Sequence, residues 1–179
     1  MAATAEEILG NYPRGRILIG VDGLPGSGRA AFADDLAAEF ARRGHEVARV
    51  SLDGFADADA ADAYRDGAVE AGFRRAVLDP FRRGSAFATD AAGAEPRAGG
   101  EDVVLVADGG FLNRSSLRGV WHYTIWLDAD EAVRAERRPG ADTAAAAAYL
   151  RDANPRGAAV AIIDNTDAEH PRRQFADAC

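Results

Sequence analysis

The stretch Arg16-Ile-Leu-Ile-Gly-Val-Asp-Gly23-Leu-Pro-Gly-Ser-Gly28-Arg-Ala30 decides the fold. Its first part, Arg16–Val21, is a short apolar run of the kind found in strands that are buried on both faces. A glycine-rich turn follows, and apolar residues then recur at helical spacing at Phe32, Leu36 and Phe40. A strand, a turn and a helix in this order are the setting that a phosphate-binding loop requires. Curled backbone amides and a helix N-terminus both attract an anion there.

Two other interpretations of this turn are open. The first is a plain glycine-rich connection between a strand and a helix. The second is a dinucleotide-binding turn, because Gly26-Ser-Gly28-Arg-Ala-Ala31 fits G-x-G-x-x-A and Asp53 ends the next strand. A dinucleotide turn, however, places its first glycine directly after the strand, whereas four residues separate Val21 from Gly26.

Strand-like and helix-like segments alternate along the rest of the chain. Further strands are predicted at Glu46–Leu52, Asp102–Ala107, Trp121–Leu127 and Ala158–Ile163. Helices are predicted at Thr4–Leu9, Ala30–Arg43, the second half of Tyr64–Arg83, Asp130–Arg138 and Asp142–Arg151. This alternation predicts one α/β domain over residues 1–179, with a parallel sheet of about five strands and helices on both faces. The glycine loop after the first strand makes the expected sheet P-loop NTPase-type.

Composition excludes several classes of function. The chain is 47% hydrophobic and 28% charged, as globular proteins are, and its net charge of −8 would repel a nucleic-acid backbone. No apolar run approaches the roughly 20 residues of a membrane span, and the single cysteine, Cys179, cannot form an internal disulfide. We therefore expect a cytoplasmic protein with a small-molecule partner. All 21 basic residues are arginine.

Five segments make the chain resemble the uridine kinase/phosphoribulokinase-like branch of P-loop kinases. They occur in the order of that family and are Ile19–Gly28, Val50–Phe55, Ala107–Leu112, Leu117–Asp128 and Ala161–Asp167. The resemblance implies an ATP site with Mg²⁺. It also implies transfer of the γ-phosphoryl group to a hydroxyl of a nucleoside or another small molecule.

The same resemblance assigns roles to residues near the strand ends. The phosphate cradle would comprise Gly23, Gly26, Ser27 and Gly28. Asp53 falls where the family has its catalytic carboxylate, and Asp108 falls where an acidic group reaches magnesium through water. For both aspartates the alternative is a cap at a strand end.

Other roles implied by the resemblance lie in the second half of the chain. Arg134, Arg137 and Arg138 occupy the region of the lid, where guanidinium groups would close on the γ-phosphate. Asn165 falls in the loop that lies beside the adenine in such kinases. The alternatives are a solvated helix face for the arginines and a turn for Asn165.

The chain departs from the family at its chemically active positions. Arg29 stands in place of the phosphate-binding lysine, and Ala30 replaces the Ser or Thr whose hydroxyl coordinates magnesium. The acceptor segment after Asp53 is reduced to alternating Ala and Asp, and Pro139-Gly140 interrupts the lid. Two hypotheses follow: a divergent ATP-dependent small-molecule kinase, or an impaired or inactive nucleotide-binding protein of the same fold.

Overall fold

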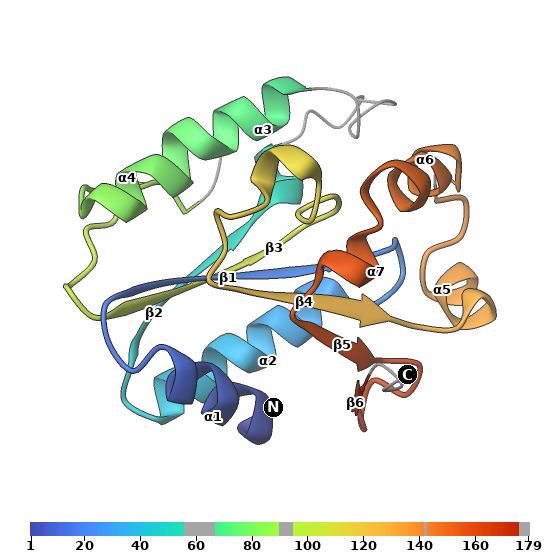
Figure 1. Ribbon diagram of the computed structural model, residues 1–179, viewed down its shortest axis with the longest axis horizontal. Coiled ribbons are helices and arrows are strands. Elements are labelled where there is room, and N and C mark those ends of the chain that lie inside the picture. Colours follow the sequence, from blue (N-terminus) through green and yellow to red (C-terminus); the bar gives the residue numbers. More distant parts are fainter. Residues whose placement is uncertain (56–66, 90–94, 142, 176–179) are drawn as a thin grey trace.

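A computed structural model of the chain describes residues 1–55, 67–89, 95–141 and 143–175. A six-stranded sheet lies between two layers of helices (Figure 1). The strands are β1 (Arg16–Gly23), β2 (Glu46–Ser51), β3 (Val103–Asp108), β4 (Tyr123–Asp128), β5 (Ala161–Asp164) and β6 (Arg172–Gln174). Their order in the sheet is β2-β3-β1-β4-β5-β6, and the five strands β1 to β5 run parallel. The predicted α/β fold class is confirmed.

The edge strand β6 was not predicted. It pairs antiparallel with β5, and its three residues are Arg172, Arg173 and Gln174. An edge strand this short and polar carries no apolar pattern that a sequence reader would recognise. The sheet therefore has one strand more than the sequence indicates.

Helices α1 and α2 cover one face of the sheet, and α3 and α4 cover the other (Figure 1). The helices are α1 (Ala2–Asn11), α2 (Arg29–Arg42), α3 (Gly67–Phe73), α4 (Asp79–Arg83), α5 (Glu131–Arg137), α6 (Thr143–Ala153) and α7 (Pro155–Ala158). A π-helical turn, Arg74–Leu78, joins α3 to α4, and 3₁₀ turns lie at Leu52–Phe55 and Ser115–Leu117. Because α1 begins before Thr4, the capping box predicted at Thr4 does not start that helix.

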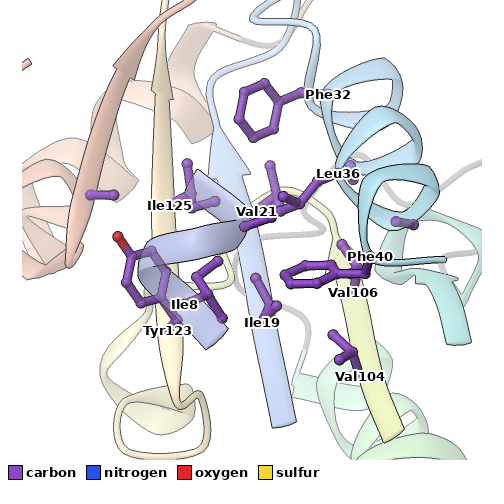
Figure 2. Close-up of a cluster of buried hydrophobic side chains, with 14 of the residues drawn as sticks. Ile8, Ile19, Val21, Phe32, Leu36, Phe40, Val104, Val106, Tyr123 and Ile125 are labelled. Carbon is purple, nitrogen blue, oxygen red and sulfur yellow. The ribbon is translucent and has the colours of Figure 1, made fainter. Parts of the chain in front are cut away.

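The alternating side chains of β1 fill two separate cores, which explains its continuous apolar sequence. Ile19 and Val21 pack against α1 and α2 on one face (Figure 2). Leu18 packs on the other face among residues of α3, the π-turn and α4, including Val77 and Phe81. Each fully buried side chain of this size contributes about 1.5–3 kcal/mol of transfer free energy, so both faces anchor β1 at the centre of the sheet.

Parallel pairing brings the carboxyl ends of the strands to one edge of the sheet. The register places Asp108 of β3 opposite Val21 of β1 and opposite Ser51 of β2, two residues before Asp53. The chain order also reverses direction in the sheet at β1, between β3 and β4, and ligands in open α/β sheets bind at such switch points. The fold therefore gathers the turn after β1, Asp53 and Asp108 at one place.

Among the described helices, none combines the length and the apolar character that a bilayer crossing demands.

Candidate functional site

The turn between β1 and α2 curls tightly because two glycines adopt left-handed backbone conformations. Gly26 has φ of +82° and Gly28 has φ of +90°, and the amide of Ser27 donates to the carbonyl of Leu24 at 3.0 Å. A Cβ at Gly28 would lie 2.6 Å from Nδ2 of Asn165, and a Cβ at Gly26 would collide with the backbone carbonyl of Arg134. Only glycine satisfies both the conformation and the space at these positions.

The start of α2 presents backbone donors that the helix itself does not use. The first helical bond runs from the Phe32 amide to the carbonyl of Gly28 at 3.0 Å, so the amides of residues 29, 30 and 31 precede it. Within the described residues, none of these three amides has a protein partner. Unpaired amides at a helix N-terminus form a binding site for an anionic group.

A cavity of about 240 Å³ opens in front of these amides. Its lining includes most of the predicted site residues: Gly26, Ser27, Gly28, Arg29, Ala30, Asp53, Asp108 and Arg138, together with Arg137. The fold thus brings together residues from the first loop, the ends of β2 and β3, and the lid region. Three predicted site residues, Gly23, Arg134 and Asn165, do not line it.

Asn165 supports the loop from behind. Its side chain is buried and donates through Nδ2 to the carbonyl of Ser27 at 2.8 Å. A second cavity of about 240 Å³ lies beside it and is lined also by Phe32, Ala31, Gly28 and Ala168. Asn165 is therefore placed between the phosphate loop and a second space that a ligand extending from the loop would reach.

Arg29 is folded against the protein. It is 9% exposed, its Nη1 donates to the carbonyl of Gly23, and its Nη2 lies 3.0 Å from Oδ2 of Asp53. A lysine has a single charged point at the end of a flexible stem, whereas the planar guanidinium can bridge two acceptors at once. Arginine at this position therefore links the first glycine of the loop to Asp53.

Asp53 is engaged through both carboxylate oxygens. Oδ1 accepts from the amide of Gly110 at 3.2 Å, and Oδ2 accepts from Arg29. Its side chain is still half exposed, and it borders both the main cavity and a smaller one of about 40 Å³ lined by Phe111 and Arg114. The acceptor segment predicted after Asp53 falls on residues 56–66, outside the described residues.

Asp108 is buried and ion-paired. Its carboxylate is 3% exposed, and Nη2 of Arg49 lies 2.7 Å from its Oδ1, at an angle that falls short of a hydrogen bond. Arg49 is not among the site residues predicted from the sequence. A charged residue inside the otherwise apolar run Val47-Ala-Arg-Val50 was the available signal, since an arginine that is partly buried in a strand favours an acidic partner.

A second buried carboxylate, Asp22, lies at the base of the loop. It accepts from the amide of Gly23 at 2.7 Å, from the amide of Asn113 at 2.8 Å, and from the hydroxyl of Tyr149 on α6. Burial raises the pKa of Asp22 above its ordinary value, and the bond from Tyr149 opposes that rise. No role was predicted for Asp22, because Asn113 and Tyr149 are distant from it in the chain.

The three lid arginines have different surroundings. Arg137 donates to the carbonyls of Asn165 and Thr166 at 2.9 and 2.8 Å, while Nε of Arg134 donates to Ala129. Arg134 lines a neighbouring cavity of about 420 Å³ rather than the main one. Arg138 borders both cavities, and within the described part of the chain its side chain makes no hydrogen bond or ion pair. Arg138 is the lid cation best placed to meet an anion.

The residues present do not fit the magnesium site that the kinase resemblance implies. Ala30 presents a methyl group, which cannot coordinate a metal, and the carboxylate of Asp108 is already compensated by Arg49. Across the described residues, no cluster of three or more His, Cys, Asp or Glu side chains could hold a metal ion.

The fold and the loop geometry define an α/β protein of the P-loop type. Within that class, the chain has the fold of uridine kinase/phosphoribulokinase-like proteins. A possible uridine kinase from Bacillus stearothermophilus superposes with a TM-score of 0.65 at 17% identity, over 89% of this chain and 95% of the other. A candidate fructose transport system kinase from Silicibacter sp. TM1040 superposes with a TM-score of 0.56 at 25% identity, over 88% and 91%. No protein-family model and no curated protein sequence matches the chain.

Proposed function

We propose that this protein binds ATP through its phosphate loop and is impaired as a kinase. The observation that carries the proposal is that, among the described residues, the amides of residues 29–31 and the guanidinium of Arg138 have no protein partner and border the same cavity. Backbone amides bind phosphate whatever the side chains are, so the changes at Arg29 and Ala30 leave this part of the site intact.

The second cavity supports a nucleotide rather than a lone phosphate as the ligand. It adjoins the loop at Gly28, and its lining combines the ring of Phe32 and the methyl group of Ala31 with the polar side chain of Asn165. Ligand sites are mostly apolar with a few polar groups that orient the ligand. A base connected to phosphates in the loop would have a mixed apolar and polar surface to contact there.

The impairment follows from the side chains around the phosphate position. A kinase needs a carboxylate that can accept the proton of the attacking hydroxyl, and here the orientation of Asp53 is fixed by Arg29 and by the amide of Gly110 rather than by a substrate. It also needs a metal or cation that bridges the phosphates, and Arg29 is directed toward Gly23 and Asp53. Removing one preorganised electrostatic contact typically lowers a rate by about 10²–10³.

A divergent kinase that phosphorylates a small hydroxyl compound is the second candidate. The position of Asp53 favours it, because this carboxylate borders both the phosphate cavity and the smaller cavity beside Phe111. A base between donor and acceptor is the arrangement that phosphoryl transfer uses. Uridine and fructose are the acceptors suggested by the descriptions of the two structural neighbours.

Calorimetric titration of ATP into a matched pair of variants tests the proposal. Ala30 is exposed at the second position of α2, so both Ala30→Glu and Ala30→Gln are compatible with folding. We expect Ala30→Glu to weaken ATP binding by about 100-fold, because its carboxylate would face the phosphates, and Ala30→Gln to weaken it less than about fivefold. Equal affinities in the two variants, or no ATP binding by the unaltered protein, would refute the proposal.

A further inference from the structure

The guanidinium of Arg49 is held at the point where α2, β2 and β3 meet. Nε donates to Oδ1 of Asp34 at 2.8 Å, and Nη1 donates to the carbonyl of Val50 at 2.7 Å. Nη2 donates to the carbonyl of Ala30 at 3.3 Å and lies 2.7 Å from Asp108. These contacts hold the guanidinium in one place, directly behind a carboxylate that lines the phosphate cavity.

This position is significant because a buried carboxylate requires a compensating positive charge. Asp108 is 3% exposed, and an uncompensated ionised carboxylate at such a depth costs several kcal/mol. In a magnesium-dependent site, the metal supplies part of that compensation. Here Arg49 supplies it permanently, so the charge of Asp108 is balanced without a divalent cation.

Asp53, like Asp108, has an arginine as its ion-pair partner. Its partner, Arg29, is a fixed cation within the cavity wall. With Arg137 and Arg138 also in the wall, three arginines stand against two aspartates among the described lining residues, which leaves an excess of positive charge without a metal. Ala30 meanwhile offers no oxygen from its side chain.

We propose that the phosphate site binds metal-free nucleotide, with arginine side chains in the role that Mg²⁺ has in a kinase. This inference rests on the proposed ATP binding and specifies the form of the ligand. Free ATP carries more negative charge than its magnesium complex, and a cavity with excess positive charge favours the more highly charged form. Arg49 acts here as a positioning residue: it neutralises Asp108 rather than contacting the ligand.

Calorimetric titration of ATP in EDTA and in excess Mg²⁺ provides the first test. We expect the affinity in EDTA to equal or exceed that in Mg²⁺, because the metal withdraws free ATP from the solution. An affinity at least tenfold higher in Mg²⁺ would overturn this inference and leave ATP binding standing. No binding in either buffer would overturn both.

Neutralising Asp108 gives opposite results for the two kinds of site. In a magnesium-dependent site, Asp108→Asn would weaken ATP binding in Mg²⁺. In the site proposed here, this substitution removes one negative charge from the cavity wall while Arg49 keeps its ion pair with Asp34, and we expect the affinity in EDTA to rise about tenfold. Asp152→Asn, which removes one exposed surface charge from the end of α6, is the control and should change the affinity less than twofold.

The role of Arg49 is tested in a variant that also lacks the negative charge of Asp108, so that no buried charge is left unpaired. Arg49→Gln alone would leave Asp108 buried and uncompensated, so the substitution is combined with Asp108→Asn, and thermal melting verifies folding. Relative to Asp108→Asn alone, we expect the double variant to bind ATP about tenfold more weakly in EDTA. An unchanged affinity would show that Arg49 contributes no charge to the site and would overturn its assigned role.

Discussion

The phosphate loop and the carboxyl ends of β2 and β3 line one cavity, but they depart from a kinase site in different ways. The loop has a backbone conformation suited to an anion: glycines 26 and 28 are left-handed, and the amides of residues 29–31 have no protein partner in the part of the chain that the structure describes. At the ends of β2 and β3, the acidic side chains are present, but each is paired with an arginine. The loop is preserved in geometry, whereas the strand ends are altered in chemistry.

This difference shows which parts of the site tolerate substitution. Phosphate binding by amides depends on φ and ψ and on the space around two glycines, so it does not require a lysine at position 29 or a hydroxyl at position 30. Metal binding and proton transfer depend on particular side-chain oxygens that are free to act. Here each aspartate is held in an ion pair with an arginine.

The largest effect is expected from a substitution at a glycine that sets the backbone conformation of the loop. Gly28→Val should abolish ATP binding and destabilise the protein by about 3 kcal/mol, because valine is strained at φ of +90° and its Cβ would meet Asn165. Gly119→Ala, at φ of +77° in open space, isolates the conformational cost alone and should remove about 1 kcal/mol. Chemical denaturation and calorimetry measure both effects. ATP binding that survives Gly28→Val would show that the loop conformation is not what binds phosphate.

A smaller effect is expected from restoring the kinase side chains. The double substitution Arg29→Lys with Ala30→Thr should raise ATP hydrolysis or phosphoryl transfer by about tenfold, since it returns a mobile cation and a magnesium-ligating hydroxyl to the loop. Coupled assays with uridine and with fructose as acceptors measure the gain. Ala30→Thr alone is the control, because Arg29 then still engages Asp53. No gain in the double variant would indicate that the strand ends, the acceptor segment or the lid limit the chemistry.

The smallest effect concerns the hydroxyl that Tyr149 donates to Asp22. Tyr149→Phe should destabilise the protein by about 1–2 kcal/mol at neutral pH and by less in acid. Burial raises the pKa of Asp22, so its contribution to stability is complete below the ordinary aspartate pKa and is lost as pH rises through the raised value. Without the Tyr149 bond that opposes this rise, the pKa of Asp22 moves higher still.

Denaturant titrations over a range of pH provide the measurement. The destabilisation caused by Tyr149→Phe should grow as pH rises, because the hydroxyl stabilises the ionised form of Asp22 in particular. A destabilisation of the same size at every pH would show that the two groups are not coupled. The base of the loop would then be held by the amides of Gly23 and Asn113 alone.

Local patterns predicted the elements whose signals lie close together in the chain. Strand β1, the glycine loop and helix α2 were predicted correctly. Their signals are an apolar run, closely spaced glycines and apolar residues at helical spacing, and all three lie within 30 residues. Asp53 and Asp108 were placed at strand ends for the same reason, and parallel pairing then brought them to one edge. The three-residue strand β6 had no such pattern and was missed.

Pairings between distant residues were beyond the reach of those patterns. Arg49 lies near the end of β2 and Asp108 at the end of β3, with α3 and α4 between them in the chain, and Asp22 and Tyr149 are 127 residues apart. The sequence shows that each is polar within an apolar setting, but not which group compensates it, because that depends on strand register and helix placement.

The amino-acid order of this chain is sufficient to establish an α/β sheet with a glycine loop made for an anion, since backbone conformation and apolar periodicity are local properties. The surroundings of Asp53 and Asp108, in contrast, depend on which charged groups lie next to them in the folded protein. Folding placed an arginine against each of them, and the interaction of charges at about 3 Å depends on tertiary distance rather than on separation along the chain.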